Sequence, residues 1–234
     1  MRLTILISCF NEKDTISEVI EKARKIAIDK EIIVIDNCST DGTRKILETY
    51  EKDKALTIIN HDKNLGFGYS MREGISIAKG EYLYAPGADL EYKMEDVYKM
   101  IEKIKTDELD GVFGSRLSDK QNISRFKLIK ERPFWLSTII STFLINLFYG
   151  RKFTDVIATK LIKTDILREL DCEVDNLAFE FELVSRLCKK GYKIGEVPVW
   201  YKARTHKEGK TIRAVDMIPA LWAIFKIKFL VRSL

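Results

Sequence analysis

The chain has 234 residues, of which 46% are hydrophobic, and its formal net charge is +5. This length and apolar content are sufficient for one globular domain with its own core, and the small positive charge is too weak to indicate a nucleic-acid-binding protein. The four cysteines lack the spacing of a metal site and are too few for a disulfide framework, so we expect reduced thiols in a cytosolic setting.

Short apolar runs alternate with helical patterns in the first half of the chain. The runs predicted to be buried strands cover residues 3–7, 32–35, 56–59, 81–85 and 111–114. Between the first two runs, apolar residues recur at the spacing of one helix face, at Ile16, Val19, Ile20, Ala23 and Ile26. Alternating strand and helix units form mostly parallel sheets with helices on both faces. We therefore predict an α/β fold with a Rossmann-like sheet.

Two of the predicted strands end in small and acidic residues. Residues 36–43 read Asp-Asn-Cys-Ser-Thr-Asp-Gly-Thr, and residues 87–91 read Gly-Ala-Asp-Leu-Glu. In an open parallel sheet the carboxyl ends of the strands meet at one edge, where ligands bind. We expect these two segments to line a ligand crevice, and we expect residues 64–68 to form the loop that opens a helix carrying Arg72.

Some of these polar residues also suit a purely structural role. Asp41 is suited to capping the helix that follows it, and Ser39 is suited to forming a turn. For both residues the structural role and ligand binding are equally open. Asp89 and Glu91 have a similar alternative, which is to cap a helix that begins near Glu95.

Two apolar segments mark the second half of the chain. Residues 133–150 contain no charged side chain, but their polar residues recur at helical spacing, which favours a helix at a boundary over one that crosses a membrane. The run 219–231 is too short to span a bilayer, because a helix rises only about 1.5 Å per residue. Two such helices with basic flanks could seat the protein on an anionic membrane surface. Packing on the domain's own core or on a second subunit is the alternative.

Six short motifs occur in the order in which one enzyme family has them. They lie at residues 8–12, 36–43, 64–66, 114–116, 179–182 and 191–198. Together they resemble the family 2 glycosyltransferases, and within them the dolichyl-phosphate mannose synthase-like branch, over nearly the whole chain. The resemblance implies a single GT-A domain over residues 1–234. Residues 1–115 would form the nucleotide-sugar-binding half, and residues 116–234 the acceptor half with the two apolar helices.

The resemblance also implies roles for residues at the strand ends. A GDP- or UDP-sugar would be bound by Ser8, Phe10, Glu12, Asp36, Asn37, Ser39, Gly66, Arg72, Gly87 and Ala88. A Mg²⁺ or Mn²⁺ ion would be held by Asp89 and Glu91 and would stabilise the charge on the departing nucleoside diphosphate. The family has Asp-x-Asp at this place, and the chain departs from it because Gly87 stands at the first carboxylate position.

The later motifs imply the catalytic and acceptor residues. Arg204 and Lys210 lie in a polar loop that would close over the donor diphosphate. Glu180, Glu182 or Asp175 would be the general base for a hydroxyl acceptor, whereas an ionised phosphate acceptor needs none. The residues expected to grip an acceptor phosphate are Arg116, Arg125 and Arg132.

These implications combine into one predicted function. The protein would be an inverting glycosyltransferase that moves a hexose from a GDP- or UDP-sugar to a polyprenyl phosphate such as dolichyl phosphate. It would be cytoplasmic and peripheral on the cytosolic membrane face, with a second copy or a membrane subunit as protein partners to consider. One alternative is a glycosyltransferase of the same fold that acts on a glycan hydroxyl. The other is a donor-binding subunit without catalysis, which Gly87 would favour.

Overall fold

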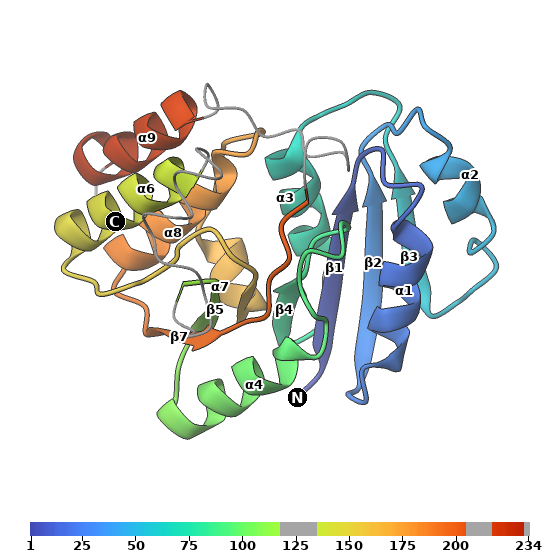
Figure 1. The fold of residues 1–234 in the computed structure, drawn as a ribbon, viewed down its shortest axis with the longest axis horizontal. Helices are drawn as coiled ribbons and strands as arrows, with labels where there is room; N and C mark the ends of the chain where they lie inside the picture. Colours follow the sequence, from blue (N-terminus) through green and yellow to red (C-terminus); the bar gives the residue numbers. More distant parts are fainter. Residues whose placement is uncertain (118–134, 205–216, 232–234) are drawn as a thin grey trace.

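A seven-stranded sheet forms the centre of the protein, and helices cover both of its faces (Figure 1). The computed structural model describes residues 1–117, 135–204 and 217–231. The strands are β1 Leu3–Cys9, β2 Lys30–Asp36, β3 Leu56–Asn60, β4 Tyr82–Ala85, β5 Gly111–Ser115, β6 Lys160–Lys163 and β7 Ile194–Pro198. The helices are α1 Ile16–Lys25, α2 Thr43–Glu48, α3 Phe67–Ile77, α4 Asp96–Asp107, α6 Trp135–Tyr149, α7 Thr164–Glu169, α8 Phe179–Lys189, α9 Met217–Phe225 and the π-helix η3 Lys226–Leu230.

The sheet is mostly parallel, with one reversed strand. Its strand order is β3-β2-β1-β4-β6-β5-β7. Strand β6 runs antiparallel to both neighbours, with Lys160 opposite Ala85 of β4 and Phe113 of β5, while the remaining pairs are parallel. Because β6 is reversed, its first residue lies near the edge where its neighbours end. Lys160 therefore joins the residues that follow the carboxyl ends of β1 and β4.

The five strands predicted from the sequence are confirmed, with their ends displaced by at most two residues. Strands β6 and β7 were not predicted. Strand β6 has only four residues and a lysine at each end, so its sequence carries no apolar alternation. It is a strand because it pairs with β4 and β5 at once, and such tertiary pairing outweighs local propensity.

The two faces of the sheet carry separate apolar cores. On β1, Ile5 and Ile7 pack towards one face and Leu6 towards the other, as the alternation of a strand requires. Helices α1 and α4 cover the first face, and the predicted apolar residues of α1 are buried there. Helices α3, α7 and α8 cover the second face.

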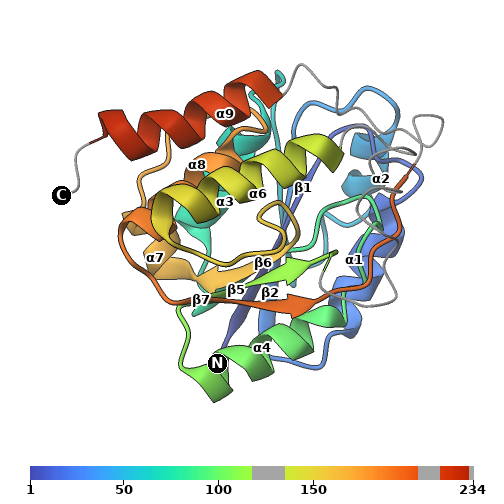
Figure 2. The same ribbon diagram turned by 60° about the vertical axis from the view of Figure 1, so that its left-hand side comes forward.

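Helices α6 and α9 lie side by side outside this second layer (Figures 1 and 2). On α6 the predicted polar stripe is present and faces inward, since Thr138, Ser141 and Thr142 are buried. Phe143 and Leu147 of the same helix are each 62% exposed. Trp135 and Ile145 are also buried, so the inward face of α6 is partly polar while large apolar residues point outward, unlike a water-soluble helix, whose outward face is polar.

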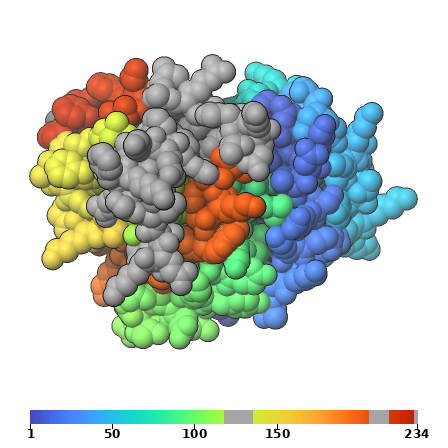
Figure 3. Space-filling model, viewed as in Figure 1, coloured from blue at the N-terminus to red at the C-terminus, as the bar shows by residue number. Residues whose placement is uncertain are grey.

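Helix α9 also directs large apolar residues outward. Its residues Ala220, Ala223 and Ile224 are buried, whereas Ile218, Trp222 and Phe225 are exposed. Figure 3 shows the side chains of α6 and α9 adjoining on the surface. The α6–α9 apolar face consists of Leu136, Phe143, Leu147, Ile218, Trp222, Phe225 and Phe229. Within residues 1–117, 135–204 and 217–231, no helix has the length and apolar content needed to span a membrane.

Candidate active site

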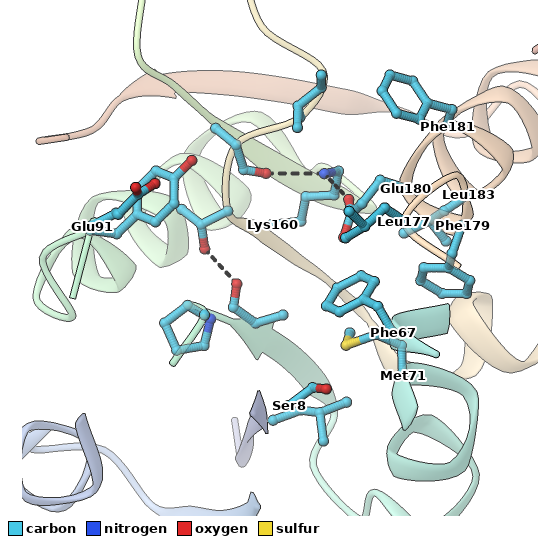
Figure 4. Close-up of a pocket in the computed structure, with 18 of the residues that line it drawn as sticks. Ser8, Phe67, Met71, Glu91, Lys160, Leu177, Phe179, Glu180, Phe181 and Leu183 are labelled. Carbon is cyan, nitrogen blue, oxygen red and sulfur yellow. Dashed lines mark hydrogen bonds and ion pairs between the residues drawn. The ribbon is translucent and has the colours of Figure 1, made fainter. Parts of the chain in front are cut away.

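A cavity of about 280 Å³ joins the strand ends to helices α6 and α9. At the strand ends it is lined by Ser8, Gly87 and Asp89, and at the other end by Thr138 of α6 and Ala220 of α9. Its interior is largely apolar, as Figure 4 shows for the residues of α3 and α8. The charged side chains that line it, among the described residues, are Asp89, Glu91, Arg116, Lys160 and Glu180.

One arginine connects the acidic residues that follow β1 and β4. Nη1 and Nη2 of Arg204 donate to the two carboxylate oxygens of Glu12 over 2.9 and 2.8 Å. The same Nη2 lies 3.4 Å from Oδ2 of Asp89. A single cationic nitrogen thus bridges Glu12 and Asp89, two carboxylates that the sequence assigned to the donor site.

Glu91 fixes the segment that carries this arginine. Its carboxylate accepts hydrogen bonds from the Tyr201 hydroxyl over 2.8 Å and from the Arg204 backbone N–H over 2.7 Å. Its backbone carbonyl accepts from the Lys202 N–H over 2.9 Å. Both carboxylate oxygens of Glu91 therefore already have protein donors. Glu91 therefore anchors residues 201–204, and its part in holding a metal stays a prediction.

Asp89 is a partly buried carboxylate whose charged neighbours include Glu91 and Arg204. Burial, followed by the negative charge of Glu91, raises the pKa of Asp89 to about 6, although Arg204 acts in the opposite direction. Its Oδ1 accepts the N–H of Glu91 over 3.2 Å, and α4 begins at Asp96 without a side-chain cap. The capping alternative for Asp89 and Glu91 is therefore wrong.

The missing first carboxylate of the Asp-x-Asp motif has a backbone explanation. Gly87 adopts a φ of +84°, which side-chain-bearing residues rarely occupy. A Cβ there would lie 3.2 Å from Oδ1 of Asp89. Ala88 is buried beside it. Among the described residues, no three His, Cys, Asp or Glu side chains form a metal-binding group.

The turn after β2 is held by buried hydrogen bonds. Asp36 is fully buried, and its carboxylate accepts the Ser39 N–H over 3.1 Å and Nε of Arg44 over 3.1 Å. Asp36 organises this turn through these bonds. Its carboxylate is buried, so the predicted contact with a nucleotide base is not open to it in this conformation. Ser39 in turn accepts the Asn11 N–H over 2.9 Å, which joins two of the predicted motifs.

Asp41 performs the structural role proposed for it. Its carboxylate accepts the N–H and the hydroxyl of Thr43, the first residue of α2, over 2.9 and 2.6 Å. It also accepts the Lys13 N–H over 3.1 Å. These bonds hold the pKa of Asp41 below its ordinary value against the opposing effect of its burial. Phe10, on the adjoining segment, is 43% exposed.

A histidine that the sequence interpretation left without a role belongs to this end of the site. Asn37 accepts hydrogen bonds from Nδ1 of His61 over 3.1 Å and from the Leu65 N–H over 2.8 Å. Its amide nitrogen donates to Asn64 over 3.0 Å, and Nε2 of His61 lies 2.6 Å from Glu73. The network ties the end of β2 to the 64–68 loop. The sequence could have indicated this role for His61 through its position alone, because it directly follows β3 and therefore lies at the same edge of the sheet.

The 64–68 loop packs closely on the segment before α8. Gly66 has a φ of +94°, and a Cβ there would lie 2.3 Å from the carbonyl oxygen of Asp175. Arg72 donates to the carbonyl of Val174 over 2.7 Å and pairs with the Asp175 carboxylate. The structure therefore uses Arg72 and Asp175 to join α3 to the α8 segment, and neither lines the cavity.

Arg116 lines the cavity, and its positive charge is paired with the carboxylate of Asp155. It donates to both oxygens of the fully buried Asp155, through Nε over 2.6 Å and Nη2 over 2.9 Å. Its guanidinium also lies 4.4 Å from the ring centroid of Trp135 and 5.0 Å from that of Tyr201. Burial favours the neutral acid, but the charge and hydrogen bonds of Arg116 outweigh it and hold the pKa of Asp155 below its ordinary value.

The two glutamates of the 179–182 motif have different surroundings. Glu180 lines the cavity and forms an ion pair with Lys160. Glu182 is 1% exposed and accepts the N–H groups of Glu173 over 3.0 Å and Val174 over 2.8 Å. Glu182 therefore shapes the chain before α8 and is not positioned to act as a base, which corrects its assignment as a catalytic candidate. Three further predicted residues lie outside the described residues: Arg125, Arg132 and Lys210.

Known proteins share both sequence and fold with the chain. The chain is 24% identical over 206 residues to the low-salt glycan biosynthesis hexosyltransferase Agl6 of Haloferax volcanii, covering 86% of this chain and 48% of that protein. It is 24% identical over 217 residues to the dodecaprenyl-phosphate galacturonate synthase of Rhizobium johnstonii, covering 90% and 62%. The chain thus spans about half of the first relative and less than two thirds of the second.

The fold is similar to that of a solved structure of glucosyl-3-phosphoglycerate synthase from Mycobacterium tuberculosis, with a TM-score of 0.66 at 15% identity, covering 99% of this chain and 81% of that one. A structure of S. aureus TarS 1–349 matches with a TM-score of 0.63 at 16% identity, covering 98% and 72%. These similarities confirm the predicted GT-A fold. The model described as glycosyl transferase family 2 matches residues 4–171. Because this match covers most of the chain and the fold agrees, the chain belongs to glycosyl transferase family 2 and is a glycosyltransferase.

Proposed function

We propose that this glycosyltransferase works at the cytosolic surface of a membrane and transfers a hexose from a UDP- or GDP-sugar to a polyprenyl phosphate. The observation that carries the proposal is the cavity, which is continuous from Asp89 at the strand ends to Ala220 on the inner side of α9. The α6–α9 apolar face lies outside that second end. A lipid-linked acceptor has this combination of a reactive polar group and an apolar chain, and one relative bears the name of a polyprenyl-phosphate sugar synthase.

The acceptor side is suited to a membrane surface. Lipid offers no hydrophobic driving force between helices, so helices in contact with lipid pack through small residues and point large apolar side chains outward. Thr138, Ser141, Ala220 and Ala223 face inward here, and the α6–α9 apolar face points outward. Because neither helix is long enough to cross a bilayer, we propose that the face inserts into one leaflet.

At the donor side, we propose that the nucleotide lies over β1 and β2 and the diphosphate near Glu12 and Asp89. The residues fit a divalent cation, because Arg204 Nη2 already lies within 3.4 Å of Asp89 and 2.8 Å of Glu12. Asp89 would hold Mg²⁺ or Mn²⁺, with Glu12 as the second carboxylate. When bound, the ion supplies Lewis-acid stabilisation of the departing diphosphate. Arg204 would then pair with the diphosphate oxygens, for which its planar fork of donors is suited.

The chemistry requires little proton transfer from the protein. An ionised phosphate oxygen of the acceptor attacks the anomeric carbon, and the bond from that carbon to the nucleoside diphosphate breaks in the same displacement, which inverts the configuration. The nucleophile needs positioning and no base. A largely apolar cavity excludes water, which would otherwise compete as the acceptor.

A second function, transfer to a glycan hydroxyl, is favoured by one observation. Glu180 lines the cavity, so a carboxylate is available as the base that a hydroxyl acceptor would need. Agl6, a relative by sequence, bears the name of a hexosyltransferase of glycan biosynthesis. A donor-binding role without catalysis is the remaining alternative. It rests on Gly87, which leaves Asp89 without its usual carboxylate neighbour.

The decisive experiment incubates the protein with membranes and a panel of radiolabelled UDP- and GDP-sugars. Label in an acid-labile, solvent-extractable lipid supports the proposed function and identifies the sugar and the base. Label in a glycan that resists extraction with the lipid moves the assignment to the hydroxyl acceptor. Donor binding without any transfer, shown by equilibrium dialysis, would identify a binding subunit.

A further inference from the structure

We propose that Lys160 binds an oxyanion of the substrate in the cavity. Without substrate, the carboxylate of Glu180 pairs with Lys160 in place of this oxyanion. The inference rests on the proposed function and adds a binding residue to it. The oxyanion assigned to this position is the phosphate of the acceptor. A carboxylate on the transferred sugar would have the same chemistry, and the experiment separates these two sources.

The reversed strand β6 puts the lysine at the right end of the sheet. Lys160 is the first residue of β6 and lies opposite Ala85, the last residue of β4. Two residues later, Ile162 projects to the same side of the sheet and also lines the cavity. Lys160 is thus the one charged position on a face of β6 that is otherwise apolar.

The ammonium group is buried in the wall of the cavity. The side chain of Lys160 is 7% exposed, and Nζ donates to the carbonyl of Ala158 over 3.0 Å and to the carboxylate of Glu180. Figure 4 shows these two contacts, with Lys160 projecting towards Glu180. A lysine ammonium has three donors, and the described residues supply acceptors for two of them. A buried cation at the border of polar and apolar surfaces suits the head group of an amphipathic ligand.

Arg116, the residue predicted for this role, is less available. Its partner Asp155 is fully buried and accepts hydrogen bonds from two of its three guanidinium nitrogens. Drawing Arg116 towards a substrate would leave that carboxylate buried and unpaired, which is strongly unfavourable. We therefore assign Arg116 to the support of the site and Lys160 to direct contact with the substrate.

Separating Glu180 from Lys160 costs less free energy than separating Asp155 from Arg116. Its side chain is 18% exposed, and it lies in the first turn of α8, where the helix dipole favours a negative charge. Replacing a buried ion pair by apolar groups is often neutral for stability. The Lys160–Glu180 pair is therefore expected to matter more for ligand binding than for folding, and an incoming phosphate exchanges with the Glu180 carboxylate at Lys160.

The test compares two substitutions with opposite expected effects. Binding of citronellyl phosphate, a short prenyl phosphate, is measured by isothermal titration calorimetry on the full chain. Lys160→Met should weaken binding by about tenfold or more, as expected for the loss of one hydrogen bond to a charged group. Glu180→Gln should strengthen binding, because it removes the internal competitor. If the pair were only structural, both substitutions would weaken binding together.

Two controls keep the result interpretable. Lys163→Met removes a lysine from the same strand whose partner is Asp110, outside the cavity, and it should leave binding unchanged. Citronellol, which lacks the phosphate, should bind equally to the unmodified protein and to Lys160→Met. The double variant Lys160→Met with Glu180→Gln avoids an unpaired carboxylate. If Lys160→Met alone fails to fold, the double variant must still show the tenfold loss, and unchanged binding by a folded double variant would overturn the inference.

Kinetics identify the source of the oxyanion. With neutral and uronic-acid nucleotide sugars as donors, an effect of Lys160→Met on the acceptor KM for every donor assigns the oxyanion to the acceptor phosphate. An effect confined to the KM of uronic-acid donors assigns it to the sugar carboxylate. Unchanged KM values in an active variant would sink the role of Lys160 alone, whereas absence of transfer by the unmodified protein would sink the proposed function.

Discussion

Arg204 and Glu12 are 192 positions apart in the sequence, yet two nitrogens of the guanidinium donate to the two carboxylate oxygens over 2.9 and 2.8 Å. The pair closes the carboxyl end of β1 with a cation from the segment after β7. Asp89 shares this cation over 3.4 Å. Under the proposed function, a bound metal and diphosphate would redistribute this charge.

The first prediction concerns this arginine. Arg204→Met should lower kcat about a hundredfold, because the diphosphate loses a placed cation as negative charge develops on it. Arg204→Lys should recover little, since an ammonium cannot reproduce a bidentate fork. Steady-state transfer assays measure both variants. Lys202→Met, at an exposed position two residues earlier, is the control and should retain full activity. Comparable kcat values for Arg204→Met and the unmodified protein would contradict a role at the diphosphate.

The second prediction concerns the cation held at Asp89. A chelator should abolish transfer by the unmodified protein, and added Mn²⁺ should restore it. Asp89→Asn should weaken Mn²⁺ binding, measured by electron paramagnetic resonance without donor, because a carboxylate ligand is lost. Glu91→Gln is the matched comparison. It should weaken Mn²⁺ binding less, since the Glu91 carboxylate already accepts hydrogen bonds from Tyr201 and Arg204. Full activity in the chelator would remove the metal and leave Arg204 to neutralise the diphosphate.

The third prediction concerns the α6–α9 apolar face. The protein should co-sediment with vesicles that contain anionic lipid. Changing Phe143, Leu147, Phe225 and Phe229 to Ser should reduce this binding, because each side chain contributes about 1 kcal/mol when its exposed area enters lipid. These side chains are 62%, 62%, 48% and 54% exposed, so the melting temperature should stay nearly unchanged.

The control for this surface is Ile77→Ser, which removes a partly exposed apolar residue of α3 outside the α6–α9 apolar face. It should leave vesicle binding unchanged. A large fall in melting temperature would instead show that these residues belong to the domain's own core, and the loss of a dimer measured by light scattering would show that they belong to a subunit interface.

The fourth prediction concerns Asp155. Its pKa is held below the ordinary value by Arg116, so its ionised form contributes stability above the unfolded pKa of about 4, and this contribution is lost as the pH falls through the lower folded pKa. Asp155→Asn should therefore reduce the free energy of unfolding by about 3 kcal/mol at pH 7. Chemical denaturation from pH 7 to pH 3 should show the difference shrinking only in the most acidic range. A difference that is constant with pH would contradict the ionic role.

The local patterns of the sequence were sufficient for the framework of the fold. Apolar runs located β1 to β5, and the spacing of apolar residues on α1 identified its buried face, because both patterns repeat over a few neighbouring residues. The order of motifs identified the GT-A fold. Of the two acidic segments expected to line a crevice, the one after β4 lines the cavity with Gly87, Asp89 and Glu91. Residues 36–43, after β2, do not line it, because Asp36 and Asp41 are hydrogen-bonded within their own turn.

Contacts between distant segments could be decided only by the tertiary structure. The reversal of β6 brings Lys160 to the strand ends beside Glu180, the segment after β7 brings Arg204 to Glu12, and Glu91 becomes an anchor because Tyr201 lies next to it. The inward direction of the polar stripe on α6 depends likewise on its packing against α8 and α9. The period of a helix or strand is local, whereas a charged side chain finds its partner only when packing of the whole chain brings the two together.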